Sequence, residues 1–351
     1  MKKQPTLRRL MAKTKSTFLS LIVNPRIRGL LVACMVVCAI VLPGTLHAIP
    51  IFISTSSGVM LGVVKEFVYD SGYTVSELDW PLLPAFYAGI TLNLGETAGF
   101  LASVELQVGI PGLDTGNMTD SDFLNGDGVK TNFSESDGVL ENAVLLSTQT
   151  GWGFPIETAR GTVITIEPFL AFEFIRLEWT AQNGYLQSPP ETSPPYTPWS
   201  PSTPQTPIYG TAIIYTQTYL IPAFGLKGIF PLTEGLTMTL SFTFSPYLWC
   251  SDEDSHLLRQ INFYDNMYGG FMLEPRLSAT YKISSRTTLS LDVLYRHIAQ
   301  LVGNEYEEGT GAADYTQNTE LPPGQQSGTF TNGGGASLDV VNISLLLGIS
   351  L

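Results

Sequence analysis

The sequence predicts an all-β protein: a ten-stranded antiparallel transmembrane β-barrel with long extracellular loops. Three observations lead to this class. Apolar and polar residues alternate in about ten segments, the chain is 44% apolar but only 14% charged, and its first residues have the composition of an export signal. Alternation with a period of two is typical of strands whose faces meet different surroundings, which in a membrane barrel are lipid outside and a polar interior.

The first 48 residues are expected to form a secretory signal peptide that is cleaved after Ala48. They hold eight Lys and Arg and no acid, followed by an apolar run from Gly29 to Leu42 and a short small-residue segment. The alternative, an uncleaved anchor, is less favoured because the apolar run is shorter than the ~20 residues of a spanning helix. Residues 49–351 would then form the barrel.

Cleavage makes the remaining chain strongly acidic. Lys and Arg fall from 18 to 10 against 31 Asp and Glu, which gives a net charge of −21. Such a chain repels nucleic acid and attracts cationic ligands, so we expect no nucleic-acid partner. Cys250 is the single cysteine after residue 48, which excludes an intramolecular disulfide in the exported chain.

The alternation is clearest at the carboxyl end, where Val341, Ile343, Leu345, Leu347 and Ile349 share one face. Segments of about ten residues suit tilted membrane strands better than a soluble sandwich, which could show the same period. Aromatic residues near segment ends suggest interfacial girdles: Phe67, Tyr69, Trp80, Trp152, Trp179, Tyr247 and Trp249. The expected strands are 57–69, 78–94, 98–109, 140–152, 162–180, 211–230, 236–250, 267–283, 287–300 and 339–351.

Connections of alternating length support the barrel. Those after Leu94, Phe230 and Ile283 are short, as is usual on one side of an outer-membrane barrel, and the others are expected to be long loops. The long loops are predicted at 110–140, 184–212, 250–266 and 299–338. Residues 189–207 are rich in proline and should be extended, and we interpret them as a passive surface loop rather than a partner-recruiting motif.

Two stretches place titratable residues two positions apart, Asp120 with Asp122 and Asp254 with His256. In extended backbone such pairs lie on one face, so two facing strands could hold a water between them. His256 could deprotonate that water while the two neighbouring aspartates share a proton, which predicts hydrolysis without a covalent intermediate. The alternatives are a cation-binding loop for the aspartates and an exposed loop histidine.

These stretches resemble the omptin family, outer-membrane endopeptidases of Gram-negative bacteria with a ten-stranded barrel and an active-site groove outside the cell. The resemblance implies an aspartic-type endopeptidase in which Asp120 with Asp122 and Asp254 with His256 activate a water. It extends over most of the exported chain. The matching segments are Gly58 to Tyr69, Ser76 to Trp80, Gly116 to Phe123 and Ser251 to His256.

The resemblance also implies cleavage next to Arg or Lys of peptide and protein substrates, with Glu66 and Asp252 holding the basic side chain and Met118 lining its pocket. The alternation around Val63 independently directs Glu66 inward. Uninterrupted alternation from Phe244 would direct Asp252 toward lipid. We therefore predict a slip of one residue near Pro246.

Family members require lipopolysaccharide on the outer wall, and for this chain that requirement is left open. Arg176 matches a lipid-binding position and shares the outward parity of Ile164 and Ile166, although a lone outward arginine is equally typical of an interfacial anchor. Phe172, Phe174 and Thr218 depart from the family pattern, as does the absence of a lysine-rich segment near Phe263 to Asp265. No metal or other cofactor is expected, and the protein should be a monomer that contacts outer-membrane lipid.

The runner-up hypothesis is a barrel of the same fold without proteolysis that serves adhesion, transport or scaffolding. A porin is less favoured because side chains fill the lumen of a ten-stranded barrel. A thiol nucleophile at Cys250 is also less favoured, because the neighbouring Asp and His are already assigned to another pair.

Overall fold

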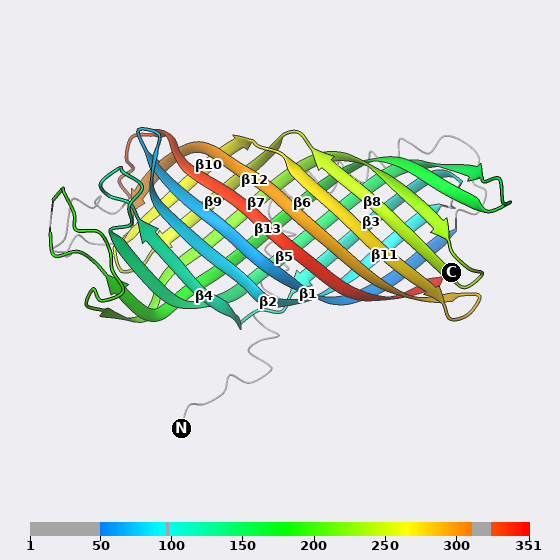
Figure 1. Ribbon diagram of the computed structural model, residues 1–351, viewed down its shortest axis with the longest axis horizontal. Coiled ribbons are helices and arrows are strands. Elements are labelled where there is room, and N and C mark those ends of the chain that lie inside the picture. The colour runs from blue at the N-terminus through cyan, green and yellow to red at the C-terminus, as the bar shows by residue number, and fades with distance from the viewer. Residues whose placement is uncertain (1–49, 96–97, 192, 311–323) are drawn as a thin grey trace, which may run out of the picture. The chain divides into compact units, whose positions relative to one another are not determined.

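The computed structural model describes residues 50–95, 98–191, 193–310 and 324–351, and the predicted signal peptide lies outside these ranges. Residues from Pro50 onward form one sheet that closes into a barrel (Figure 1). Its strands are β1 (Ile51–Asp70), β2 (Tyr73–Gly95), β3 (Gly99–Gly109), β4 (Leu113–Asp122), β5 (Asn132–Glu157), β6 (Val163–Gln187), β7 (Thr206–Pro231), β8 (Leu236–Ser245), β9 (Leu248–His256), β10 (Ile261–Gly269), β11 (Met272–Lys282), β12 (Thr287–Gly309) and β13 (Phe330–Ser350). Among the described residues no helix has the length and apolar character to cross a membrane.

The thirteen segments occupy ten positions around the ring, which confirms the predicted strand number. At three positions two segments follow one another in the same place. Both β3 and β4 lie between β2 and β5, β8 and β9 both pair with β7, and β10 and β11 both pair with β12. The antiparallel pairing of β1 with β13 closes the ring and removes its edges.

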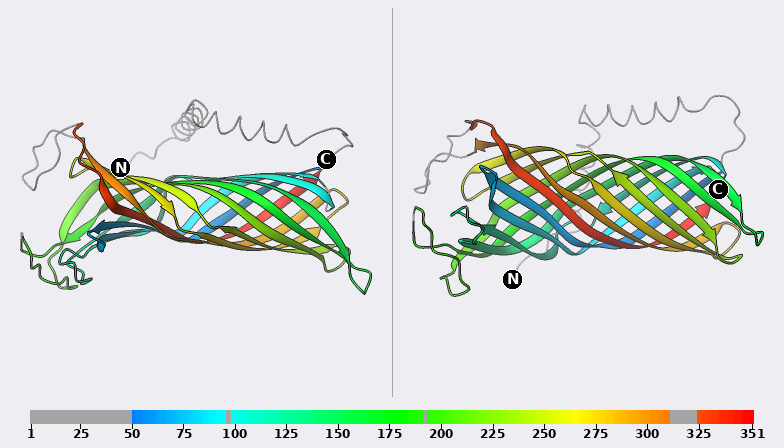
Figure 2. Two further views of the ribbon diagram at one scale, coloured as in Figure 1. Left: turned by 90° about the horizontal axis from the view of Figure 1, so that it is seen from above. Right: turned by 45° about the horizontal axis from the view of Figure 1, so that its top comes forward.

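The connections differ between the two ends of the barrel, as expected. Those that follow β5, β7 and β11 are short and lie at one end, which also holds the carboxyl terminus (Figures 1 and 2). The opposite end carries the longer loops 123–131 and 188–205. We call these the short-turn end and the loop end.

The predicted long loops are wrong in their extent. Much of 110–140 is strand, as β4 and the beginning of β5, and β9 and β10 take up most of 250–266. The sequence hides these strands because their alternation is not apolar against polar. Backbone pairing continues past the membrane, where water can meet polar side chains on the outer face and apolar residues can pack inside.

The polarity of the two strand faces inverts along the barrel, and β6 shows this clearly. Toward the short-turn end Leu170 is exposed on the outer face while Glu167 and Glu173 are buried inside. Toward the loop end the inward residues Leu177 and Trp179 are buried and apolar. Outward apolar residues near the short-turn end form a belt suited to lipid, which includes Phe86, Ile90, Leu92, Val104, Leu170, Phe224, Leu226, Leu240, Phe242, Leu289, Leu291, Leu345 and Leu347.

The same inversion corrects part of the predicted aromatic girdle. Trp152 and Tyr247 are exposed on the outer wall, as a girdle residue should be. Trp80 and Trp179 are completely buried inside the barrel and belong to its apolar core at the loop end. The alternation of residues alone cannot distinguish an outer girdle from an inner core, because a tryptophan near a strand end fits both.

Charged residues fill the interior at the level of the belt. Arg296 contacts Glu173 at 2.6 Å and Glu274 at 2.5 Å, and all three side chains are less than 10% exposed. Arg276 contacts Asp292 at 2.8 Å and Glu105 at 3.1 Å. These pairs satisfy charges that would otherwise be costly in a narrow lumen.

We predict that Arg296→Met destabilises the barrel strongly, because it leaves Glu173 and Glu274 buried without their shared cation. Loss of one partner of a buried pair costs about 3–5 kcal/mol in the free energy of unfolding. Urea unfolding of the detergent-folded protein measures it, and Arg286→Met in an exposed short turn is the matched control. An unfolding free energy equal to that of the control would contradict this assignment.

Candidate active site

Asp120 and Asp122 lie on one face of β4, near the loop end and outside the belt. Their strand pairs with β2 and β5, which place Asp122 opposite Ser76. Ser76 Oγ donates a hydrogen bond of 2.9 Å to Asp120 Oδ1, and Asn132 Nδ2 donates one of 3.0 Å to Asp122 Oδ2. The two carboxyl groups are therefore fixed side by side, as the two-residue spacing predicted.

Asp254 and His256 lie on one face of β9. His256 Nε2 is 2.6 Å from Asp254 Oδ2, and the carboxylate assigns the ring proton to Nε2. Nδ1 is then the basic nitrogen, with Arg259 Nη1 at 3.5 Å. Phe263 packs edge-to-face against the imidazole, with ring centroids 5.2 Å apart, and restricts its rotation.

The inward direction of Asp252 and Asp254 depends on an interruption between β8 and β9. Pro246 and Tyr247 are both exposed, so the inward positions change from odd numbers in β8 to even numbers in β9. Ser245 Oγ donates to Pro222 O at 2.7 Å and lies 2.9 Å from Tyr247 O, which holds the chain at the interruption. The predicted one-residue slip near Pro246 is confirmed.

The two pairs influence one another electrostatically, and we call the part of the barrel interior that holds both pairs the cleft. Burial raises the pKa of Asp120 well above its usual range, with Asp122 and then Asp254 adding to the rise. Burial also raises the pKa of Asp122, and the hydrogen bond from Asn132 and then the charges of Arg259 and of a protonated His256 oppose that rise. A base oriented by a carboxylate therefore faces an aspartate pair that tends to keep a proton, which is suited to activating a water.

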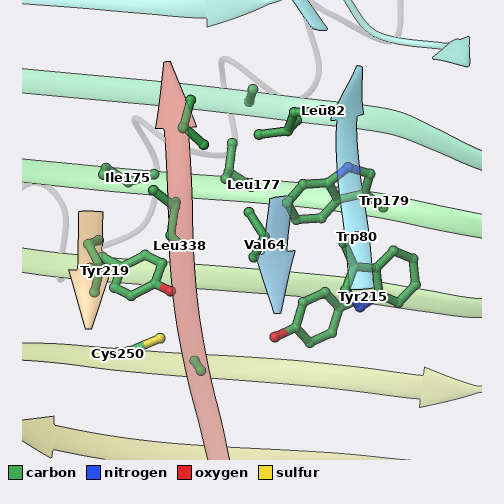
Figure 3. Packing of buried hydrophobic residues seen from close by; sticks show 14 of the residues in the cluster. Val64, Trp80, Leu82, Ile175, Leu177, Trp179, Tyr215, Tyr219, Cys250 and Leu338 are labelled. Atoms are coloured by element: carbon green, nitrogen blue, oxygen red, sulfur yellow. The ribbon is translucent and has the colours of Figure 1, made fainter. Parts of the chain in front are cut away.

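An aromatic cluster packs beside the acidic residues inside the barrel. Trp80, Trp179 and Tyr215 pack together, with the rings of Trp80 and Tyr215 stacked at 5.0 Å (Figure 3). Met118, 1% exposed, belongs to the same apolar core and lies on the face of β4 that carries Asp120. Met118, to which the resemblance assigns the substrate pocket, is buried inside the barrel, and so are the two tryptophans that were predicted for the outer girdle.

Glu66 and Asp252 are buried in the same cleft, with 3% and 6% exposure. Tyr215 donates to Asp252 Oδ2 at 3.1 Å and in turn accepts a bond of 2.7 Å from Gln217 Nε2. Glu66 Oε2 has no hydrogen-bond partner. Burial and then the nearby Asp254 and Asp252 raise the pKa of Glu66 well above its usual range.

Several polar residues of the cleft were not predicted as site residues. Asp265 and Glu305 are buried inward, and Ser76 and Asn132 position the aspartate pair. The sequence could have identified Asp265, because a hairpin with its turn at 257–260 pairs this residue with Asp252. Glu305 offers no such local signal, since it belongs to a strand that the sequence ended at residue 300.

Arg176 lies on the outer wall of β6 rather than in the cleft. Its side chain is 36% exposed and Nη2 is 3.4 Å from Glu178 Oε2 on the same strand. The outward direction agrees with the expected parity. Within the described ranges no set of His, Cys, Asp and Glu side chains has a metal-binding arrangement.

The raised pKa of Glu66 predicts that this residue lowers stability as pH rises. A carboxyl group with a folded-state pKa above its unfolded value binds more protons when folded, so unfolding becomes easier as pH increases through the folded pKa. We expect Glu66→Gln to stabilise the barrel at pH 8 and to have a smaller effect at pH 5. Urea unfolding at both pH values checks this, with Glu253→Gln on the outer face as the control. A destabilised variant at pH 8 would contradict it.

Comparison with known proteins agrees with this geometry. The model of the omptin family matches residues 47–329. The plasminogen activator of Yersinia pestis is 24% identical over 279 residues, which cover 74% of this chain and 77% of the relative. The crystal structure of the outer membrane protease OmpT from Escherichia coli superposes with a TM-score of 0.73 at 18% identity, and covers 86% of this chain and 97% of OmpT. The chain belongs to the omptin family of outer-membrane proteases.

Proposed function

We propose that this omptin is an endopeptidase that hydrolyses peptide bonds next to Arg or Lys by activating a water between Asp254–His256 and Asp120–Asp122. The observation that carries the proposal is the inward arrangement of both pairs around one cleft, with His256 Nε2 held at 2.6 Å by Asp254. Family membership supports peptide bonds as the substrate. The two pairs in the cleft supply the general base and the proton donor.

In the proposed reaction, His256 Nδ1 takes a proton from the water and the resulting hydroxide attacks the scissile carbonyl carbon. Asp254 stabilises the imidazolium that forms, and the protonated carboxyl group of the Asp120–Asp122 pair donates a hydrogen bond to the developing oxyanion. The imidazolium then protonates the leaving amine. No step requires a covalent bond between enzyme and substrate.

The basic side chain of the substrate would enter the acidic part of the cleft that contains Glu66 and Asp252, against Met118. Buried carboxylates without a matching cation favour a positively charged ligand strongly, because binding supplies the missing charge. The net charge of −21 expected for the exported chain would also attract basic substrates to the loop end.

The proposed orientation places the loop end outside the cell and the short turns in the periplasm, as in outer-membrane barrels generally. The cleft then meets external proteins. The monomeric state stays a prediction.

His256→Ala and Asp120→Asn should each abolish most cleavage, because a general base or acid contributes about 10²–10⁴-fold to a rate. A fluorogenic peptide with Lys-Arg, incubated with the detergent-folded protein, measures the effect. The matched control is His297→Ala, since His297 pairs with Asp339 at 2.7 Å outside the cleft and should keep wild-type activity. Wild-type protein that cleaves no basic peptide would favour a non-proteolytic barrel.

We also propose that Arg176 binds a lipid phosphate on the outer wall. Arg176→Ala should then lower any activation of peptide cleavage by added lipopolysaccharide severalfold and leave lipid-free activity unchanged. Titration of activity against lipopolysaccharide measures this, with Arg160→Ala at the short-turn end as the control. Identical titration curves for all three proteins would remove Arg176 from lipid binding.

A further inference from the structure

Three buried carboxyl groups form one row across neighbouring strands of the cleft. Asp265 on β10 lies directly opposite Asp252 on β9 and directly opposite Glu305 on β12. Their exposures are 6%, 6% and 5%. Acidic residues placed directly opposite one another repel, so a row of three is unfavourable unless protons or a cation compensate it.

The fold provides space for this row. A Cβ atom added at Gly334 would lie 2.1 Å from the carboxyl carbon of Asp265, and one at Gly333 would lie 3.0 Å from Cβ of Glu305. Glycine on β13 therefore allows these side chains to occupy the interior. Asp265 Oδ1 and Glu66 Oε2 are buried and have no hydrogen-bond partner.

A proton partly compensates the row in the free protein. Asp252 and Asp265 lie directly opposite each other and both are buried, so a proton on one of them relieves the repulsion between the two carboxyl groups. Burial and then Asp252 raise the pKa of Asp265 to about 11, and burial raises the pKa of Glu305 to about 7. The charged or polar groups that face this row are Glu66, Asp254, Glu307, Arg259 and Tyr215.

The row suits a planar cation with several donors. A guanidinium group has five N–H donors in a fixed fork and can bond two carboxylates at once, whereas an ammonium group has three donors around one point. Carboxyl oxygens arrive from β1, β9, β10 and β12, so a fork can use oxygens that a point charge cannot reach together.

We propose that Asp265 is a specificity-determining residue that, with Asp252, selects arginine over lysine next to the cleaved bond, and that arginine entry releases a proton from these two carboxyl groups. This rests on the proposed endopeptidase function. Charge balances in the step, because the pocket gains one positive guanidinium and loses one proton to solvent.

The first test measures binding without cleavage. Full-length His256→Ala protein is titrated calorimetrically at pH 7 with a peptide that contains one arginine and with its lysine twin, in two buffers of different protonation enthalpy. We expect tighter arginine binding with release of about one proton. Adding Asp265→Asn should remove most of that release, because the asparagine amide donates to Asp252 without a titrating proton. Adding Glu253→Gln instead should change neither quantity.

The second test measures cleavage with the active protein. Asp265→Asn should lower the arginine-to-lysine ratio of kcat/KM roughly tenfold, and the change should appear in KM rather than in kcat. A tenfold change corresponds to the free energy of a one-unit change in pKa. In the wild type KM for the arginine peptide should fall between pH 6 and pH 8, and in the variant it should change less. Glu305→Gln is a second variant in the same row and should lower the ratio in the same direction.

The outcomes separate the two proposals. If the wild type cleaves no basic peptide, the endopeptidase proposal fails, yet calorimetry still tests the pocket. If both Asp265→Asn and Glu305→Gln fold, as shown by resistance to urea, and keep the arginine preference and the proton release, the role of Asp265 is overturned. Loss of proton release with an unchanged arginine preference also overturns it, because the two effects must occur together.

Discussion

The pairing of β1 with β13 is the constraint on which the rest of the structure depends. An apolar surround offers no water to unpaired backbone groups, so a sheet that crosses it must close. The closing pair runs from Phe52 opposite Ser350 to Val68 opposite Gly334 and so continues past the belt. The last paired residues at the loop end place Glu66 and the glycines of β13 beside the acidic row. Closure therefore also builds the cleft.

Charge is handled differently at the two levels of the barrel. At the level of the belt, Arg276, Arg296 and Lys227 each contact carboxylates, and the interior is compensated within the protein. Beyond the belt the buried carboxyl groups of the cleft lie close to one another. There, bound protons rather than cations reduce the repulsion between them. A site whose carboxyl groups lack paired cations has free energy available for binding a basic ligand, at the expense of the stability of the empty barrel.

The sequence predicted the ring of ten strands, the inward direction of Glu66 and the slip near Pro246, because each depends on local alternation. It failed for Trp80, Trp179 and the strands hidden in the predicted loops. These depend on the height at which a strand leaves the membrane, where lipid outside becomes water and the polar interior becomes packed. The apolar parity of β6 changes there, from Phe174 outward to Leu177 inward. Period alone does not locate that change.

The same change of surroundings explains why the candidate pairs can be rigid although they lie outside the membrane. Asp120 and His256 would be mobile on free loops, but β4 and β9 continue the barrel sheet and are paired on both sides. Buried Trp179 and Tyr215 pack beneath this extension as a soluble protein core would. Apolar packing inside the extension thus replaces the contacts with lipid that end at the membrane surface. The paired strands hold the side chains of the cleft in fixed positions.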